Sequence, residues 1–100
     1  MKINLPKSIT ICGIEYKICE ASKVKDPTGR NKNELGIGGF INYVKNIIVI
    51  SKRADNRDRV FWHEVVHGIL FENGYLYHTN EELVDRLARG ITEVLQSIEG

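Results

Sequence analysis

The sequence predicts an α+β fold: a small antiparallel or mixed sheet of about four strands, followed by two packed C-terminal helices. Two observations lead to this prediction. Short segments rich in β-branched residues fill the first half of the chain, whereas apolar residues at helical spacing fill the second half. Because the chain has 100 residues, we expect a single domain, with a strand half at 1–54 and a two-helix half at 55–100.

Two β-rich segments, residues 9–11 and 14–18, flank the pair Cys12-Gly13. The second segment alternates apolar and polar residues, so we expect a hairpin with one buried face. Cys12 and Cys19 are expected to be free thiols, because a reducing cytosol prevents disulfide formation and their spacing is not that of a zinc knuckle.

A polar stretch, residues 21–38, follows and is rich in turn-forming residues. We expect a long loop, either a plain surface excursion or a flap near the functional site. Residues 39–44 and 47–50 then predict a second strand pair about Lys45-Asn46. The run 47–50 is apolar throughout, which is typical of a strand buried on both faces.

Two helices are predicted for the second half. The first has Asp55 or Asn56 as its N-cap and ends at Asn73-Gly74. The second is expected to start at Thr79, with Glu82 completing a capping box. Apolar residues spaced at three and four predict one buried stripe on it: Val84, Leu87, Ala88, Ile91, Val94, Leu95 and Ile98.

Composition and charge narrow the functional classes. We expect an intracellular protein without a membrane partner, because no stretch approaches the ~18 apolar residues of a membrane span and the N-terminus has no secretory h-region. The net charge of +1 argues against a general nucleic-acid-binding protein. However, residues 1–54 hold 10 Lys/Arg against 4 Asp/Glu, and residues 55–100 hold 4 against 9. The basic half indicates either solvated lysines or an acidic partner.

Residues 63–67 read His-Glu-Val-Val-His, the HExxH pattern, inside the first predicted helix. Two histidines four residues apart stand on one helix face, about 6 Å apart along the axis, so both imidazoles can bind one metal ion. Glu64 can then act as general base toward a water at that metal. With 3 His and 9 Glu in the chain, chance predicts roughly 0.008 such matches. The alternative is an amphipathic helix whose histidines are surface or core residues.

A catalytic zinc ion usually has three protein ligands, so one more is expected after the first helix, from His78, Glu81, Glu82 or Asp85. The position of each residue around the second predicted helix favours Glu81, which lies on the apolar stripe, whereas Glu82 lies on the solvent-exposed face. The alternative for Glu81 is a charge that stabilises the first helical turn. Asp85 either orients a ligating histidine or pairs with Arg89.

Residues 80–85 read Asn-Glu-Glu-Leu-Val-Asp, an NExxxD pattern downstream of HExxH. This pair of motifs resembles the gluzincins, the thermolysin-like zinc peptidases. The short gap between the motifs and the order of sheet and helices look more like the minimal gluzincins and the phage-associated ImmA/IrrE-like metallopeptidases. The resemblance covers about residues 56–98.

The resemblance implies a zincin-like fold with one Zn²⁺ per chain, bound by His63, His67 and Glu81. It further implies that Glu64 is the catalytic base and acid, and that Asp85 orients a ligating histidine. A peptide or protein substrate and cytoplasmic expression in a bacterial host, from a phage gene, are implied as well.

Family peptidases also carry a Tyr or His that stabilises the tetrahedral oxyanion. No motif matches that residue here, so the candidates rest on position alone: Tyr75, Tyr77 and His78.

The sequence thus predicts a zinc metalloendopeptidase whose Glu64 activates the attacking water. We expect its substrate to lie extended along residues 39–44. One alternative is a non-catalytic zinc-binding module that binds a regulator. Another is a metal-dependent nuclease of the YbeY kind, which residues 67–70 and 74–75 resemble. The later histidine of that signature falls on Phe71 or Tyr77 here, which removes a ligand.

Overall fold

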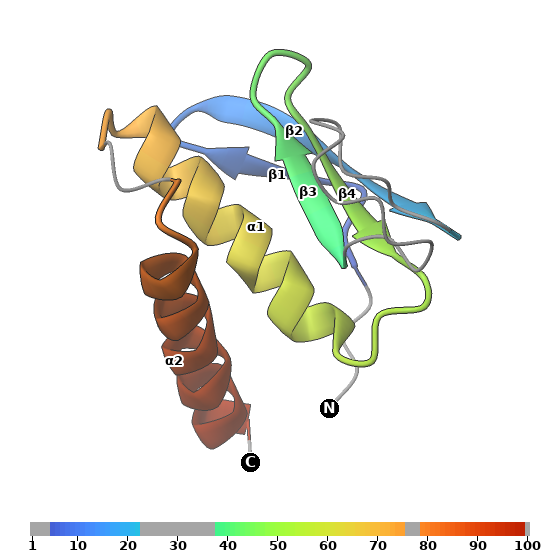
Figure 1. The fold of residues 1–100 in the computed structure, drawn as a ribbon, viewed down its shortest axis with the longest axis vertical. Coiled ribbons are helices and arrows are strands. Elements are labelled where there is room, and N and C mark those ends of the chain that lie inside the picture. The colour runs from blue at the N-terminus through green and yellow to red at the C-terminus, as the bar shows by residue number, and fades with distance from the viewer. Residues whose placement is uncertain (1–4, 23–37, 76–78, 100) are drawn as a thin grey trace.

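The computed structural model describes residues 5–22, 38–75 and 79–99. A four-stranded sheet is followed by two helices, so the predicted α+β class is confirmed. The elements are β1 (Ser8–Ile11), β2 (Ile14–Ala21), β3 (Gly39–Asn42), β4 (Ile47–Ser51), α1 (Arg57–Glu72) and α2 (Glu81–Glu99). Figure 1 shows α1 lying across one face of the sheet, with α2 packed against α1 on the side away from the strands.

The sheet is mixed, and its strand order is β1-β2-β4-β3. Both predicted hairpins are present as antiparallel pairs, β1 with β2 and β3 with β4. The two hairpins join through parallel pairing of β2 with β4, in which Ile18 lies opposite Ile48. As a result, β3 is an edge strand of the described sheet.

Turn chemistry sets the ends of the strands. Cys12 and Gly13 both have positive φ, at 50° and 83°, as a two-residue hairpin turn requires. In the second hairpin, the side-chain oxygen of Asn42 accepts hydrogen bonds from the backbone N–H groups of Val44 and Lys45. β3 therefore ends at Asn42 rather than at residue 44, because these amides bond to a side chain instead of continuing a ladder.

The predicted start of the polar loop at residue 21 is wrong. Ala21 is the last residue of β2 and lies opposite Ser51 in the parallel ladder with β4. The ladder provides hydrogen-bond partners for the backbone at the end of β2, although the sequence there begins a polar stretch. The segment 23–37, which holds most of the predicted loop, lies outside the described residues.

The main core lies between α1 and the sheet. It is built from buried residues of β1, β2, β4 and α1: Ile11, Tyr16, Ile48, Ile50, Phe61 and Val65. Ile48 and Ile50 are fully buried, but Ile47 and Val49 on the opposite face of β4 are only half-buried. The prediction that β4 is buried on both faces is thus wrong for one face, since the described helices cover only the other.

A second, smaller core lies between the helices, where Val66 of α1 meets Val84 and Ala88 of α2. α1 is consequently apolar on two sides, one facing the sheet and one facing α2. Gly68 allows a close approach to the sheet, because a Cβ at this position would lie 2.8 Å from the Cδ1 atom of Ile11. The helix that carries the HExxH pattern is therefore held from both sides.

A partly buried hydrogen bond ties the end of α1 to β2. Tyr16 is fully buried, and its hydroxyl donates to the carboxylate of Glu72 at 2.8 Å. Burial raises the pKa of Tyr16 to about 12, and the hydrogen bond to Glu72 adds to this effect.

The caps of α1 are confirmed, but the predicted cap of α2 is wrong. Asn56 accepts from the N–H of Arg59 at the start of α1, and Gly74 has a φ of 76° after its end. In α2, the side chain of Asn80 accepts from the N–H of Leu83 at 3.0 Å, so Asn80 takes the N-cap position predicted for Thr79. Glu82, predicted to complete a capping box, forms an ion pair with Arg86 at 2.8 Å.

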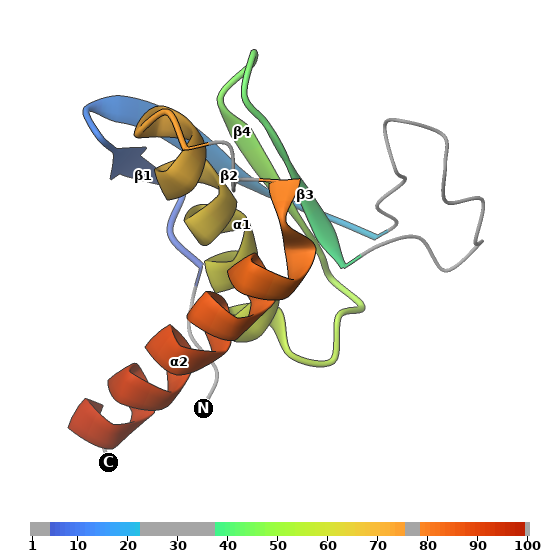
Figure 2. The same cartoon turned by 60° about the vertical axis from the view of Figure 1, so that its left-hand side comes forward.

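Only part of the predicted stripe on α2 is buried. Val84 and Ala88 pack on α1, whereas Leu87, Val94 and Ile98 are 43%, 58% and 76% exposed. Figure 2 shows the reason, because the C-terminal end of α2 projects away from the rest of the fold. Within the described residues, neither helix combines the length and apolar character that crossing a membrane requires.

Candidate metal centre

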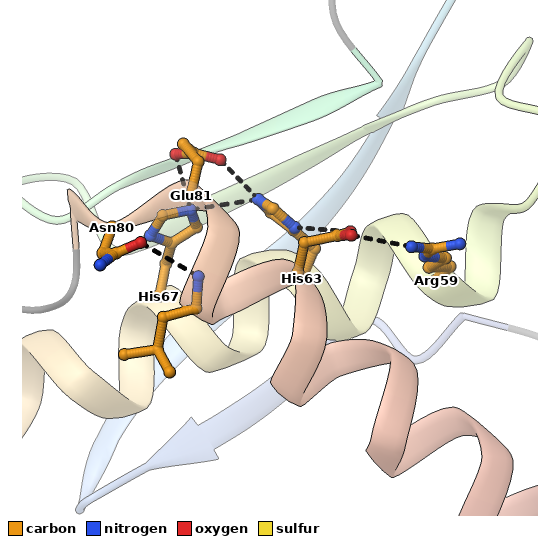
Figure 3. A network of polar contacts seen from close by, with 7 residues as sticks. Arg59, His63, His67, Asn80 and Glu81 are labelled. Atoms are coloured by element: carbon orange, nitrogen blue, oxygen red, sulfur yellow. Dashed lines mark hydrogen bonds and ion pairs between the residues drawn. The ribbon is translucent and has the colours of Figure 1, made fainter.

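His63, His67 and Glu81 meet where α2 begins beside α1 (Figure 3). Oε2 of Glu81 lies 2.9 Å from Nε2 of His63, and Oε1 of Glu81 lies 3.0 Å from Nε2 of His67. The two Nε2 atoms lie 3.2 Å apart. These three residues form a group that can hold a metal ion, and both histidines and the glutamate were singled out from the sequence.

Local structure explains why the three side chains converge. The histidines are one turn apart on α1, so both face α2. Asn80 caps α2 and thereby fixes Glu81 as its first helical residue. The side chain of His67 is 8% exposed and that of His63 is 19% exposed, whereas that of Glu81 is 70% exposed. The group therefore lies at the surface, with imidazoles on its inner side and a carboxylate on its outer side.

The three side chains offer imidazole nitrogens and carboxylate oxygens, which are donors that zinc and other divalent ions accept. Zinc binds imidazole nitrogen and carboxylate oxygen at about 2.0–2.2 Å, and adjacent donors of such a tetrahedron lie ~3.3 Å apart. One ligand atom from each of the three residues can be chosen so that all lie within 4.8 Å of one another, which is compatible with a single bound ion. In a tetrahedral site, one ligand atom from each of the three residues would leave one coordination position open.

Glu64 lies beside this group and is buried, with 6% of its surface exposed. Burial raises its pKa from 4.5 to about 8, and the negative charge of Glu81 adds to the increase. A carboxyl group with a pKa near neutrality can exchange protons at working pH, as a general base or acid requires.

Asp85 lies between His63 and an arginine that the sequence argument did not consider. One carboxylate oxygen accepts a hydrogen bond from Arg59 at 2.8 Å, and the other lies 3.7 Å from Nδ1 of His63. Arg89, the partner that the sequence suggested, lies 3.7 Å from Glu93 instead. Helix periodicity could have predicted this neighbour of His63, because Arg59 is one turn before His63 on the same face of α1.

A cavity of about 310 Å³ opens beside the group. It is lined by Gly38 and Gly39 at the start of β3, by His63 and Glu64, and by other residues of α1 and α2. Gly39 allows β3 to approach α1, because a Cβ there would lie 2.7 Å from the carbonyl oxygen of Val49 and 2.9 Å from Cγ1 of Val60. The edge strand, the cavity and the candidate metal ligands are therefore neighbours.

Of the three predicted oxyanion-stabilising residues, Tyr75 is the one that lies within the described part of the chain. Tyr75 is 55% exposed, and its backbone N–H donates to the carbonyl oxygen of Leu70 beyond the end of α1. Tyr77 and His78 lie outside the described residues.

Tyr43 is a further candidate, which the sequence did not single out. Its ring stacks on Phe71, with ring centroids 4.0 Å apart, and Phe71 lies one turn after His67 on α1. Burial raises the pKa of Tyr43, and the charges of Glu64 and Glu81 raise it further, so the phenol lies within electrostatic reach of both. No sequence motif marks Tyr43, which lies in the turn between β3 and β4 and contacts α1 through Phe71.

Comparisons with family models, with curated proteins and with solved structures found no match to this chain. The functional argument therefore depends on the site itself.

Proposed function

We propose that this chain is a zinc-dependent peptidase that hydrolyses a peptide bond with Glu64 as general base. The observation that carries the proposal is the convergence of His63, His67 and Glu81 beside the buried Glu64, at a cavity below the edge of β3. A non-catalytic metal site has no need for a buried carboxyl group of raised pKa next to an open cavity.

His63, His67 and Glu81 would hold one zinc ion per chain. When bound, this ion would supply Lewis-acid activation of water and of the substrate carbonyl. A cation beside Glu81 also offsets the negative charge that contributes to the raised pKa of Glu64. Glu64 is thus able to ionise, to accept a proton from the attacking water and to return it to the leaving amine.

The substrate would bind as an extended strand along β3. β3 is an edge strand of the described sheet, so its outer backbone groups can pair with a peptide. Gly38 and Gly39 line the same cavity as His63 and Glu64, which would bring the paired peptide over the reacting groups. Tyr43 would donate a hydrogen bond to the oxyanion, and Asp85 would orient His63 through its Nδ1 atom.

A peptide-library cleavage assay, with and without chelator, tests the proposal. We expect cleavage by the zinc-loaded protein, loss of cleavage with chelator, and recovery after zinc is restored. Glu64→Gln should retain one zinc ion per chain and lose hydrolysis. If the wild-type protein binds zinc but cleaves no peptide, the non-catalytic zinc-binding module becomes the better interpretation. Cleavage by Glu64→Gln at the wild-type rate would show that the assigned mechanism is wrong.

A further inference from the structure

A second cavity, of about 440 Å³, lies at the end of β2. Four charged residues line it: Lys7, Glu20, Lys52 and Arg57. None of the candidate metal ligands lines it, so this cavity is separate from the metal centre. The alternation of β2 places Glu20 on the same sheet face as Tyr16, so the cavity opens between the sheet and the first turn of α1.

Main-chain hydrogen bonds fix the positions of the two lysines beside β2. The N–H of Ile18 donates to the carbonyl oxygen of Lys7 at 2.9 Å, and the N–H of Lys52 donates to the carbonyl oxygen of Ala21 at 2.8 Å. Arg57, the first residue of α1, provides the third cation. Three separate parts of the backbone thus hold positive charges around one cavity.

Among the described residues that line this cavity, positive charges outnumber negative ones. Glu20 forms an ion pair with Arg57, which offsets one of the three cations. Among the described residues, the Nε atom of Arg57 is buried without a hydrogen-bond partner, and neither lysine ammonium pairs with a carboxylate. Adjacent like charges repel, so an anion bound in the cavity would reduce the repulsion among these cations.

We propose that this cavity binds an oxyanion, either a phosphate or a carboxylate group of a ligand, between Lys7, Lys52 and Arg57. Arginine presents planar N–H donors that match the oxygens of both groups, and lysines add point charges. Lys7 and Lys52 belong to the basic half of the chain. Part of the excess positive charge of that half would therefore serve to bind a ligand, rather than being only solvated.

Titration of the full chain with inorganic phosphate, followed by ¹H–¹⁵N NMR, tests this proposal. We expect saturable shifts centred on the amides of Lys7, Glu20, Lys52 and Arg57, with a Kd on the order of 1 mM. Succinate at the same ionic strength forms the second arm, and sodium chloride is the blank. The anion that saturates at the lower concentration identifies the group that the cavity prefers.

Two double variants with the same loss of charge distinguish a specific anion site from non-specific electrostatic attraction. Lys7→Gln with Lys52→Gln should weaken binding about tenfold or more, because two charge-assisted contacts are lost. Lys17→Gln with Lys45→Gln removes the same charge elsewhere and should leave the Kd within about twofold. The proposal is overturned if both pairs weaken binding equally, or if neither anion saturates. Zinc binding and peptide cleavage do not enter this test, so its result is independent of the proposed peptidase function.

Discussion

The carboxylate of Glu81, at the start of α2, lies 2.9 Å from Nε2 of His63 in the middle of α1, although 18 residues separate them along the chain. A metal ion at this point would link the two helices, whose shared core is small. Folding and metal binding are therefore expected to be coupled.

Zinc should raise the thermal stability of the metal-free protein. At a free zinc concentration about 100 times the Kd, binding adds about 2.7 kcal/mol to the free energy of unfolding. For a domain of this size, that gain raises Tm by roughly 10–20 °C. Circular dichroism melting curves with zinc and with chelator measure the shift, and equal Tm values would argue against a zinc site.

Glu81→Gln should weaken zinc binding by at least about 100-fold. Loss of an outer hydrogen-bond partner already costs 10–100-fold, and a direct ligand contributes more. Glu82→Gln is the matched control, because Glu82 is adjacent but pairs with Arg86. Competition with a chromophoric chelator measures both affinities. Similar affinities for the two variants would remove Glu81 from the ligand set.

The stability of the metal-free protein should depend on pH through Glu64. Its pKa is 4.5 when unperturbed and about 8 in the folded chain. Between these values the folded protein keeps a proton that the unfolded chain has lost, so stability falls as pH rises. The contribution is complete below about pH 4.5 and is lost by about pH 8, at up to about 1.4 kcal/mol per pH unit.

Denaturant unfolding in the presence of chelator, compared between wild type and Glu64→Gln, isolates this effect from other titrating groups. We expect the difference in unfolding free energy between the two proteins to change steadily across this pH range. A constant difference would mean that the pKa of Glu64 is not raised.

Tyr43→Phe should reduce peptide hydrolysis by about 100-fold, the lower limit for losing one oxyanion donor. The phenyl ring preserves stacking on Phe71, so folding and zinc affinity should change little. Tyr75→Phe is the control, since Tyr75 is exposed beyond the end of α1. The loss should appear in kcat rather than in KM. Equal activity of the two variants would exclude Tyr43 from the reaction.

Two glycine substitutions should have opposite effects on stability, because the space around the two positions differs. Gly39→Ala should destabilise the fold by about 1–3 kcal/mol, because its Cβ would lie 2.7 Å from the backbone oxygen of Val49. Gly90→Ala should stabilise the fold by about 0.5–1 kcal/mol, since the position is helical and has open space around it. Urea unfolding measures both. A stable Gly39→Ala protein would indicate looser packing of β3 against β4 and α1 than the contacts with Val49 and Val60 imply.

Local sequence signals predicted the elements of this fold well. Positive φ at Gly13, the cap at Asn56 and the stop at Gly74 follow from chemistry within a few residues, and each lies where expected. The errors also have local causes. Asn42 and Asn80 bond to nearby amides and move the end of β3 and the start of α2.

The sequence by itself determined that two imidazoles share one face of α1, because helical periodicity fixes the relation of His63 to His67. It also selected Glu81, since helix phase separates that residue from Glu82. Only the tertiary structure decided the parallel pairing of β2 with β4, the exposure of part of the apolar stripe on α2 and the stacking of Tyr43 on Phe71. These features depend on contacts between distant segments, and their free energy comes from packing and burial that no local pattern encodes.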